Sequence, residues 1–214
     1  SMILVTPDAE RTMNTYLGVS SSLCIGDLDL EAIAAGEVLY MEGYLFDRDE
    51  AKAAFKTASQ FAHEAGRKVA LTLSDSFCVD RHRDDFLDLI LNDIDVLFCN
   101  EFELQSLYQT SYEEALEQLR SDCEFGAVTR DKRGSVVING HDLVHIEPEP
   151  VDRVVDATGA GDQYAAGLLY GFTRGMAIEH CGRLGSMSAS EVITHVGPRP
   201  LVQLSTLIPE HLRS

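Results

Sequence analysis

Short apolar runs alternate with longer amphipathic stretches through the middle of the chain. The runs Val38–Leu45, Lys68–Ser74 and Asp95–Cys99 are brief and rich in aliphatic residues, which predicts three buried strands. Between the first two, Glu50–Ala65 repeats apolar residues with the period of a helix, and Gly66 follows as a helix stop. Strands and helices in alternation are joined by right-handed crossovers. The pattern therefore predicts an α/β fold, with a mostly parallel sheet and helices on both of its faces.

The rest of the chain adds an opening hairpin and more alternating elements. Ile3–Thr6 and Arg11–Leu17 predict two strands around a polar turn, and Asp27 is expected to cap a short helix that runs through Ala35. Further helices are expected over Asp84–Leu91, Glu101–Tyr108 and Tyr112–Arg120, and further strands over Gly126–Thr129, Gly134–Ile138 and Asp142–Ile146. From Gly159 onward the pattern is helical apart from glycine and proline breaks. Without a repeat or a linker, residues 1–214 are predicted to form a single domain.

Two glycines carry more specific expectations. The pair Asn139-Gly140 stands between two predicted strands and is typical of a tight hairpin turn. Gly43 lies within an apolar run, where a glycine indicates a close approach of another backbone.

Charge limits the kinds of partner that the chain can bind. The 214 residues include 35 acidic and 17 basic side chains, so the formal net charge is −18. A surface this negative repels nucleic-acid phosphates and anionic headgroups, so we expect a small-molecule partner and neither nucleic acid nor membrane. No apolar run approaches the length of a membrane span. The five cysteines are widely spaced without a Cys-x-x-Cys pair, which is typical of a reducing, cytoplasmic location.

The segment that carries chemistry runs into a predicted apolar helix. Three small residues, Gly159, Ala160 and Gly161, stand directly before Asp162. Small residues at a helix start leave backbone N–H groups uncovered, and together with the helix dipole these groups form a site for a phosphoryl group. The carboxylate of Asp162 would repel that anion unless it faces the attacking nucleophile and accepts its proton. The segment thus predicts an anion hole with a base beside it, as phosphoryl transfer requires.

Two better-known phosphate motifs are absent from the sequence. No lysine follows a Gly-x-x-x-x-Gly loop, and Gly159-x-Gly161 does not extend to the dinucleotide-binding pattern because Tyr164 stands at the third glycine position. A capped core helix is the other interpretation, in which Asp162 only favours the helix N-terminus. Asp156 and Thr158, directly before the glycines, favour the phosphotransferase interpretation.

Three motifs resemble one known family. Asp156-x-Thr-Gly-Ala-Gly-Asp162 resembles the C-terminal signature of the ribokinase-like (PfkB) carbohydrate and nucleoside kinases. Asn100-Glu-Phe-Glu103 resembles the family's Asn-x-x-Glu motif, and Val128–Gly134 resembles the strand-turn segment along the nucleotide. The motifs occur in the family's order, and the resemblance covers essentially the whole chain. The opening Thr6–Thr15 is most similar to the adenosine-kinase-like branch.

The resemblance implies an ATP-dependent kinase that moves the γ-phosphoryl group to a hydroxymethyl group of a sugar or nucleoside, an adenosine-like acceptor among them. It implies that Asp162 is the catalytic base and that Gly159, Ala160 and Gly161 form the catalytic anion hole. Direct in-line transfer needs no covalent enzyme intermediate, which agrees with the absence of a Ser-His or Cys-His arrangement.

The resemblance also implies the residues that bind cofactors. Asn100 and Glu103 would act through Mg²⁺ and its waters, and Thr129 and Gly134 would border the nucleotide. Many family members bind a monovalent cation such as K⁺, for which Asp156 and the carbonyl of Thr158 are the expected ligands here. Whether this chain binds K⁺ is left open by its sequence.

The chain departs from the family at its start. In the family, the signature follows a longer N-terminal part that holds a Gly-Gly motif, the strands of a lid and most of the acceptor pocket. Here Asp156 comes earlier, so the chain is expected to be the C-terminal, nucleotide-binding portion of a longer kinase, lacking the N-terminal part and most of the lid. Strand edges left uncovered favour a homodimer. The alternative is a nucleotide-binding or regulatory module without kinase activity.

Weaker candidates have structural interpretations. Arg81–Arg83 could contact phosphate, but a solvated helix entry is favoured, and His141 and His145 are expected to be surface or packing residues. Cys99 follows a buried strand and is expected to be a core residue. Arg11 and Asn14, on the opening hairpin, could face the acceptor or the phosphates.

Overall fold

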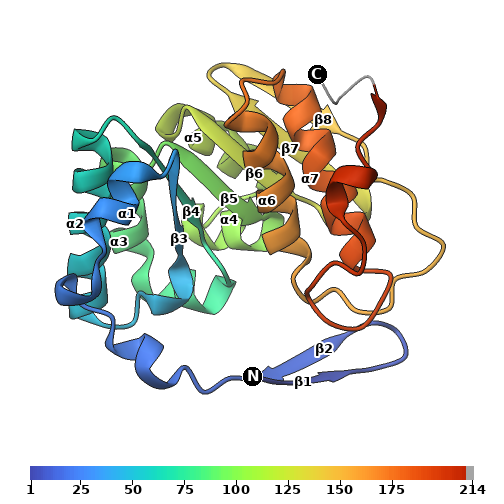
Figure 1. The fold of residues 1–214 in the computed structure, drawn as a ribbon, viewed down its shortest axis with the longest axis horizontal. Coiled ribbons are helices and arrows are strands. Elements are labelled where there is room, and N and C mark those ends of the chain that lie inside the picture. Colours follow the sequence, from blue (N-terminus) through green and yellow to red (C-terminus); the bar gives the residue numbers. More distant parts are fainter. Residues whose placement is uncertain (211–214) are drawn as a thin grey trace. The chain divides into compact units, whose positions relative to one another are not determined.

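The computed structural model describes residues 1–210 and contains one large sheet with flanking helices (Figure 1). Its strands are β3 (Val38–Glu42), β4 (Lys68–Thr72), β5 (Val96–Asn100), β6 (Phe125–Thr129), β7 (Ser135–Asn139) and β8 (Asp142–Ile146), and they lie in that order across the sheet. β3 pairs in parallel with β4, and β4 pairs in parallel with β5. A separate antiparallel hairpin joins β1 (Met2–Val5) to β2 (Arg11–Asn14). The predicted α/β architecture and the opening hairpin are confirmed.

The helices follow the strands as the apolar pattern predicts. They are α1 (Leu30–Ala35), α2 (Asp49–Glu64), α3 (Ser76–Asp93), α4 (Glu101–Tyr108), α5 (Tyr112–Asp122), α6 (Ala160–Phe172) and α7 (Ile178–Val192). Gly66, just beyond α2, has a φ of +71°, and Gly140 between β7 and β8 has a φ of +59°. Both glycines adopt the left-handed conformation that their predicted stop and turn require. None of these helices, within residues 1–210, is long and apolar enough to cross a membrane.

Two predicted helix starts are wrong. Asp29, and not Asp27, caps α1, because its carboxylate accepts the N–H of Ala32 at 3.0 Å. α3 begins at Ser76, well before the predicted Asp84, because Asp75 caps it there by accepting the N–H of Cys78 at 2.8 Å. The helix also bends at His82, where φ is −127°, and this bend breaks the apolar period on which the prediction depended. The prediction for the last third holds as far as Val192.

The described residues divide into two groups, each with its own dense packing. One, here called the β3–β5 unit, contains Leu17–Val128 and Ile138–Leu143. The other, here called the α6–α7 unit, contains Ser1–Tyr16, Thr129–Val137 and the chain from Val144 onward.

The β3–β5 unit is centred on its parallel strands. Leu71 of β4 and Leu97 of β5 are register partners and are fully buried, as is Phe86 of α3. Gly43, directly after β3, has no room for a side chain, because a Cβ there would lie 2.7 Å from the carbonyl oxygen of Leu73. The close backbone approach predicted for Gly43 is confirmed.

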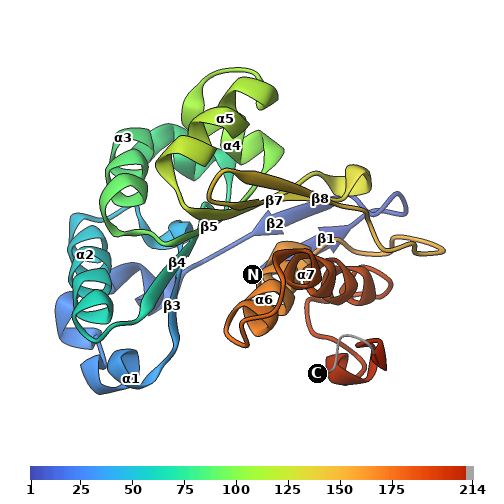
Figure 2. The ribbon, with the colours of Figure 1, turned by 90° about the horizontal axis from the view of Figure 1, so that it is seen from above.

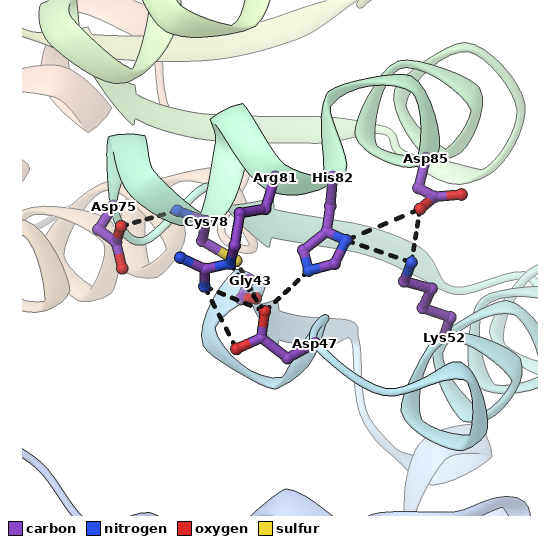
Figure 3. A network of polar contacts seen from close by, with 8 residues as sticks. All are labelled: Gly43, Asp47, Lys52, Asp75, Cys78, Arg81, His82 and Asp85. Carbon is purple, nitrogen blue, oxygen red and sulfur yellow. Dashed lines mark hydrogen bonds and ion pairs between the residues drawn. The ribbon is translucent and has the colours of Figure 1, made fainter.

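A polar network in the β3–β5 unit ties the segment after β3 to the bend of α3 (Figure 3). Arg81 donates from Nη2 to Asp47 Oδ1 at 3.0 Å, and His82 Nε2 lies 2.8 Å from the same oxygen. On the other side of His82, Lys52 Nζ lies 3.3 Å from Nδ1 and forms an ion pair with Asp85 at 2.5 Å. The bend thus has polar contacts on both sides of the imidazole ring.

We expect Asp47→Asn to lower the free energy of unfolding at pH 7 by less than about 1 kcal/mol, since Asp47 is half-exposed. The hydrogen bond with His82 lowers the pKa of Asp47, against burial and with help from Arg81. A lowered folded-state pKa stabilises the protein above the unfolded-state pKa of about 3.9, and this gain is lost as the pH falls through the folded-state value. Urea denaturation at pH 7 and at about pH 3.5 should show the deficit shrinking in acid. Asp84→Asn, at a 93% exposed side chain, is the control.

In the α6–α7 unit, two helices lie side by side along a seam of small residues (Figure 2). A Cβ on Gly167 of α6 would lie 2.3 Å from the carbonyl oxygen of Leu184 in α7, and one on Gly185 would lie 2.9 Å from the carbonyl of Tyr164. Gly182 similarly faces Ile146 and Val137, so α7 also packs against β7 and β8. These glycines let the backbones approach closely, which positions the start of α6.

Gly167→Ala is therefore expected to lower the free energy of unfolding by about 2–3 kcal/mol, because the new methyl group must push the helices apart. Gly66→Ala is the control. It also adds one methyl group, at a positive φ but with no atom within 4 Å, and should cost only about 1 kcal/mol of backbone strain. Urea denaturation measures both variants, and equal losses would contradict the tight seam.

Candidate active site

At the start of α6, the N–H of Ala160 donates to the carbonyl of Ala157 at 3.3 Å, whereas the two amides that follow it have no partner inside the helix. Gly159, the N-cap, has a φ of +79°, and a Cβ there would lie only 2.6 Å from the Cβ of Pro198, so only glycine fits. Gly161 is exposed, and a Cβ there would meet no atom of the described residues within 4 Å outside its own helix turn. The N–H groups of Gly161 and Asp162 belong to the first helical turn, where the helix itself offers no acceptor. Because Asp162 is also exposed, an open carboxylate stands beside amides that can receive an anion.

The loop before α6 is held by a buried carboxylate. Asp156 is 2% exposed, and its Oδ1 accepts the N–H and the hydroxyl of Thr158 at 2.9 and 2.6 Å. Its Oδ2 accepts the N–H of Gly197 at 2.9 Å. Burial acts to raise the pKa of Asp156, but these hydrogen bonds and the nearby charge of Arg11 outweigh it and lower the pKa below its usual value. Asp156 is therefore an ionised group that fixes the shape of the loop leading to Gly159.

A second tight turn lies in the same unit as α6. Thr129 ends β6, and Gly134 precedes β7 with a φ of +74°. The N–H of Arg130 donates to the carbonyl of Gly134 at 2.8 Å and closes the turn. A Cβ on Gly134 would lie 2.0 Å from the carbonyl oxygen of Ile146, so this position also requires glycine.

A buried hydrogen bond joins this turn to α6. The hydroxyl of Ser135, the residue after Gly134, lies 2.7 Å from the hydroxyl of Tyr164. Tyr164 stands two residues after Asp162 in α6. Burial raises the pKa of Tyr164 to about 12, so the phenol stays protonated and bound. The structure thus brings the turn with Thr129 and Gly134 into direct contact with the helix that carries Asp162.

Asn100 and Glu103 lie in the β3–β5 unit, where they form a capping box at the start of α4. The side-chain oxygen of Asn100 accepts the N–H groups of Phe102 and Glu103 at 2.9 Å. Glu103 accepts in return from the backbone N–H of Asn100 at 2.9 Å and from its side-chain amide at 2.7 Å. Such a box stabilises the helix start by itself.

Burial raises the pKa of Glu103 to about 7, although the N–H of Asn100 opposes the shift and the charge of Asp75 adds to it. A cation near this carboxylate would bring the pKa back down by favouring the ionised form. The carboxylate is therefore chemically suited to a nearby Mg²⁺. Within residues 1–210, no three His, Cys, Asp or Glu side chains are grouped to hold a metal by themselves.

The remaining candidates have structural partners. Arg81 pairs with Asp47 and is half-exposed, as a solvated residue should be, but it lies inside α3 and not at the predicted helix entry. Cys99 is buried, and burial raises the pKa of its thiol well above the usual value. None of the five cysteines, each within the described chain, forms a disulfide. Arg11 carries its charge near Asp156, so the hairpin residue acts on the loop of the signature.

Several residues of this site have no signal in the sequence. Gly197 and Pro198 contact the signature loop from some 40 positions away, and the Ser135–Tyr164 pair depends on how β7 and α6 pack. The pair Gly197-Pro198 indicates a turn at that place, but it does not indicate which residues the turn contacts. Gln163 also has no signal in the sequence for its contact, in which its side-chain amide donates to the carbonyl of Pro198 at 3.4 Å.

Comparison with known proteins gives matches over nearly the whole chain. The profile described as pfkB family carbohydrate kinase matches residues 1–204. The chain is similar to a solved probable sugar kinase protein from Rhizobium etli CFN 42, at 46% identity and a TM-score of 0.93 over 96% of this chain and 63% of that one. It is also similar to the adenosine kinase from Sinorhizobium meliloti, at 47% identity and a TM-score of 0.93 over 96% of this chain and 64% of that one.

A more distant solved structure shares the fold. A protein provisionally named Ribokinase II from E. coli, in complex with ATP and Mg²⁺, has a TM-score of 0.78 at 18% identity, over 87% of this chain and 62% of that one. The chain spans less than two thirds of the length of each of these three proteins.

Proposed function

The chain belongs to the pfkB family of carbohydrate kinases, and on that basis we propose that it carries the phosphoryl-transfer site of an ATP-dependent kinase. The acceptor is a hydroxymethyl group of a sugar or a nucleoside, and an adenosine-like nucleoside is one candidate. Family membership supports phosphoryl transfer in general. The ATP donor and the hydroxymethyl acceptor are the parts that this proposal adds.

One observation carries the proposal: the exposed carboxylate of Asp162 stands beside uncovered amides at the start of α6. In the reaction, the acceptor oxygen attacks the γ-phosphorus in line as its proton passes to Asp162, and ADP leaves. The amides of Gly159, Ala160 and Gly161 would stabilise the charge on the oxygens of the moving phosphoryl group, and that of Ala160 would do so while it also donates to Ala157. Thr129 and Gly134 border the nucleotide on the turn that the Ser135–Tyr164 bond ties to α6.

Two cations belong to the same proposal. Mg²⁺ would supply positive charge to the phosphate oxygens, and Asn100 and Glu103 would hold its waters. The distant E. coli relative binds ATP with Mg²⁺, which supports this pairing of ligands. K⁺ would lie against the carboxylate of Asp156 and the carbonyl of Thr158. Each oxygen of Asp156 has lone pairs beyond those used by Thr158 and Gly197, so the carboxylate can accept such an ion.

The chain is further proposed to act as a single α/β domain, the C-terminal and nucleotide-binding portion of a longer kinase. Its coverage of 63% and 64% of the two similar solved structures supports this. Apolar side chains on the hairpin, including Met2 and Leu4, are more than half exposed, which fits either a further segment or a homodimer as their cover. The acidic net charge of −18 supports a small-molecule partner, and the five widely spaced cysteines support a cytoplasmic location.

The second candidate function is a nucleotide-binding or regulatory module without kinase activity. The chain covers only 63% and 64% of the two similar solved structures, which favours this function if the acceptor pocket is formed by the part that it does not cover. Asp162 opposes it, because a module that only binds phosphate gains nothing from a carboxylate beside its anion hole.

An assay of ADP release by the full protein tests the proposal, with ATP and Mg²⁺ against adenosine, inosine, ribose and fructose. We expect release with at least one acceptor and a product that carries one additional phosphoryl group by mass spectrometry. ATP binding without release for any acceptor would favour the regulatory module. Failure to bind ATP would contradict both functions.

A further inference from the structure

The segment directly after α7 contacts the loop that leads into the candidate anion hole. We call residues 195–201 the bracing loop. Its Gly197 donates its backbone N–H to Oδ2 of Asp156 at 2.9 Å. The next residue, Pro198, lies so close to Gly159 that a Cβ there would be 2.6 Å from the proline Cβ. A shift of the bracing loop therefore moves the residues that shape the anion hole.

Apolar packing does little to hold this loop in place. Val196 is 74% exposed and Leu201 is 75% exposed. The loop has no regular secondary structure, and Gly197 adopts a φ of +99° with open space around it. A segment with so little buried apolar surface depends mainly on its polar contacts. The bonds of Gly197 with Asp156 and of Pro198 with Gln163 fix its middle and leave its far end to another contact.

Glu191, in the last turn of α7, supplies that contact. Its Oε1 accepts the backbone N–H of Leu201 at 2.9 Å and lies 3.4 Å from Nε2 of His195, an atom that makes no hydrogen bond within the described residues. The carboxylate therefore contacts both ends of the bracing loop. The side chain is only 11% exposed.

The other carboxylate oxygen of Glu191 shows that an acidic side chain is energetically costly at this position. Oε2 is buried and has no hydrogen-bond partner among residues 1–210. A buried carboxylate oxygen without a partner costs folding free energy, and an apolar side chain of similar size would avoid that cost. The acidic residue is thus better explained by its effect on the loop than by a contribution to stability.

From these contacts we infer that Glu191 is a positioning residue for phosphoryl transfer, which acts through the bracing loop on Gly159 and Asp156. The inference rests on the proposed function and extends it to a residue outside the three family motifs. The anion hole must match the transferring phosphoryl group closely, since misplacement of a catalytic group by about 1 Å can cost about 100-fold in rate. Glu191 touches neither substrate nor cofactor.

Glu191→Met tests this directly, because it keeps the length of the side chain and removes the acceptor. We expect kcat to fall about tenfold or more, KM for the phosphoryl acceptor to stay the same, and the preference for ATP over ADP in binding to fall. Glu191→Gln keeps an oxygen that can accept from Leu201, so it should retain most of the wild-type kcat. Leu201→Pro removes the backbone N–H that donates to Glu191, at an exposed position, and should have the same effects as Glu191→Met. It therefore provides a second test if Glu191→Met folds poorly.

Asp29→Ala is the matched control. It also removes a carboxylate that accepts a backbone N–H, at the start of α1, and has no place in the proposed site. It should lower stability without changing kcat or the preference for ATP over ADP. Unchanged kinetics in Glu191→Met, or a loss in Glu191→Gln as large as in Glu191→Met, would overturn the inference.

Hydrogen exchange separates this inference from the proposed function. Without any nucleotide, Glu191→Met should speed amide exchange in residues 156–163 and 195–201, while Asp29→Ala should not. Slow, unchanged exchange in residues 156–163 would overturn the role of Glu191 even in an active kinase. Faster exchange in a protein that never transfers a phosphoryl group would support the coupling and contradict the proposed function alone.

Discussion

Replacement of Asp162 by asparagine is expected to lower kcat by about 10²–10⁴-fold, the usual contribution of a general base. The asparagine side chain occupies the same space but cannot accept the proton of the attacking hydroxyl. KM for ATP should change little, because the amides of the first turn of α6 are left in place. Steady-state kinetics on the full protein with the best acceptor measures both constants.

The fold should tolerate this change. Asp162 is exposed, and an acidic residue in the first turn of a helix contributes only about 0.3–1 kcal/mol. Glu179→Gln is a matched control, since Glu179 is an exposed acidic residue in the first turn of α7. It removes the same charge from a helix start and should leave kcat unchanged. Turnover that survives in Asp162→Asn would show that the carboxylate is not the base.

Local chemistry explains which parts of the fold were predictable from the sequence. The hairpin between β7 and β8 could be predicted because Asn139-Gly140 determines its turn without help from the rest of the chain, and Gly140 has the required positive φ. Gly66 likewise ends α2 where the pattern indicated. The start of α3 has a local signal in its cap, Asp75, but the bend at His82 interrupts the apolar period that would reveal it. That bend could not be predicted, because it is held by Asp47 and Lys52 from other parts of the chain.

The candidate site divides in the same way. Gly159 and Asp162 could be selected from the sequence because the anion hole and the base lie in one continuous segment. The contact of Pro198 with Gly159 could not, since it depends on where the chain returns after α7. Nor could the pKa of Glu103 be predicted, because it depends on burial that only the packed structure determines.

Glu103→Gln is expected to change stability and activity in opposite directions. Burial raises the pKa of Glu103 to about 7, above the value of about 4.3 for an unfolded chain. The folded state therefore binds this proton more tightly than the unfolded state does. Its stability falls as the pH rises from about 4 through about 7 and then levels off. Glutamine avoids the buried charge but loses one of the two bonds from Asn100, so at pH 8 we expect a net gain of about 1–3 kcal/mol.

The gain should vanish at about pH 3, below the unfolded-state pKa of about 4.3, where the carboxyl group is protonated in both states. Urea denaturation across this range measures it. Glu114→Gln is the control at the corresponding place in α5, where the side chain is exposed and a hydrogen bond from Thr110 lowers the pKa of Glu114. A lowered pKa reverses the sign, so this control should lose a little stability above about pH 4 and gain none.

Activity decides between the two roles of Glu103. A carboxylate that holds the waters of Mg²⁺ through hydrogen bonds contributes about 10–100-fold, so Glu103→Gln should lower kcat/KM by that factor and raise the Mg²⁺ concentration needed for half-maximal rate. If the capping box were its whole purpose, the variant would be more stable and fully active, since glutamine also suits that position. The Glu103 carboxylate lowers the stability of the fold. If its removal also slows phosphoryl transfer, its role is in the reaction. A stable variant with unchanged Mg²⁺ dependence would instead leave Asn100 and Glu103 as a helix cap.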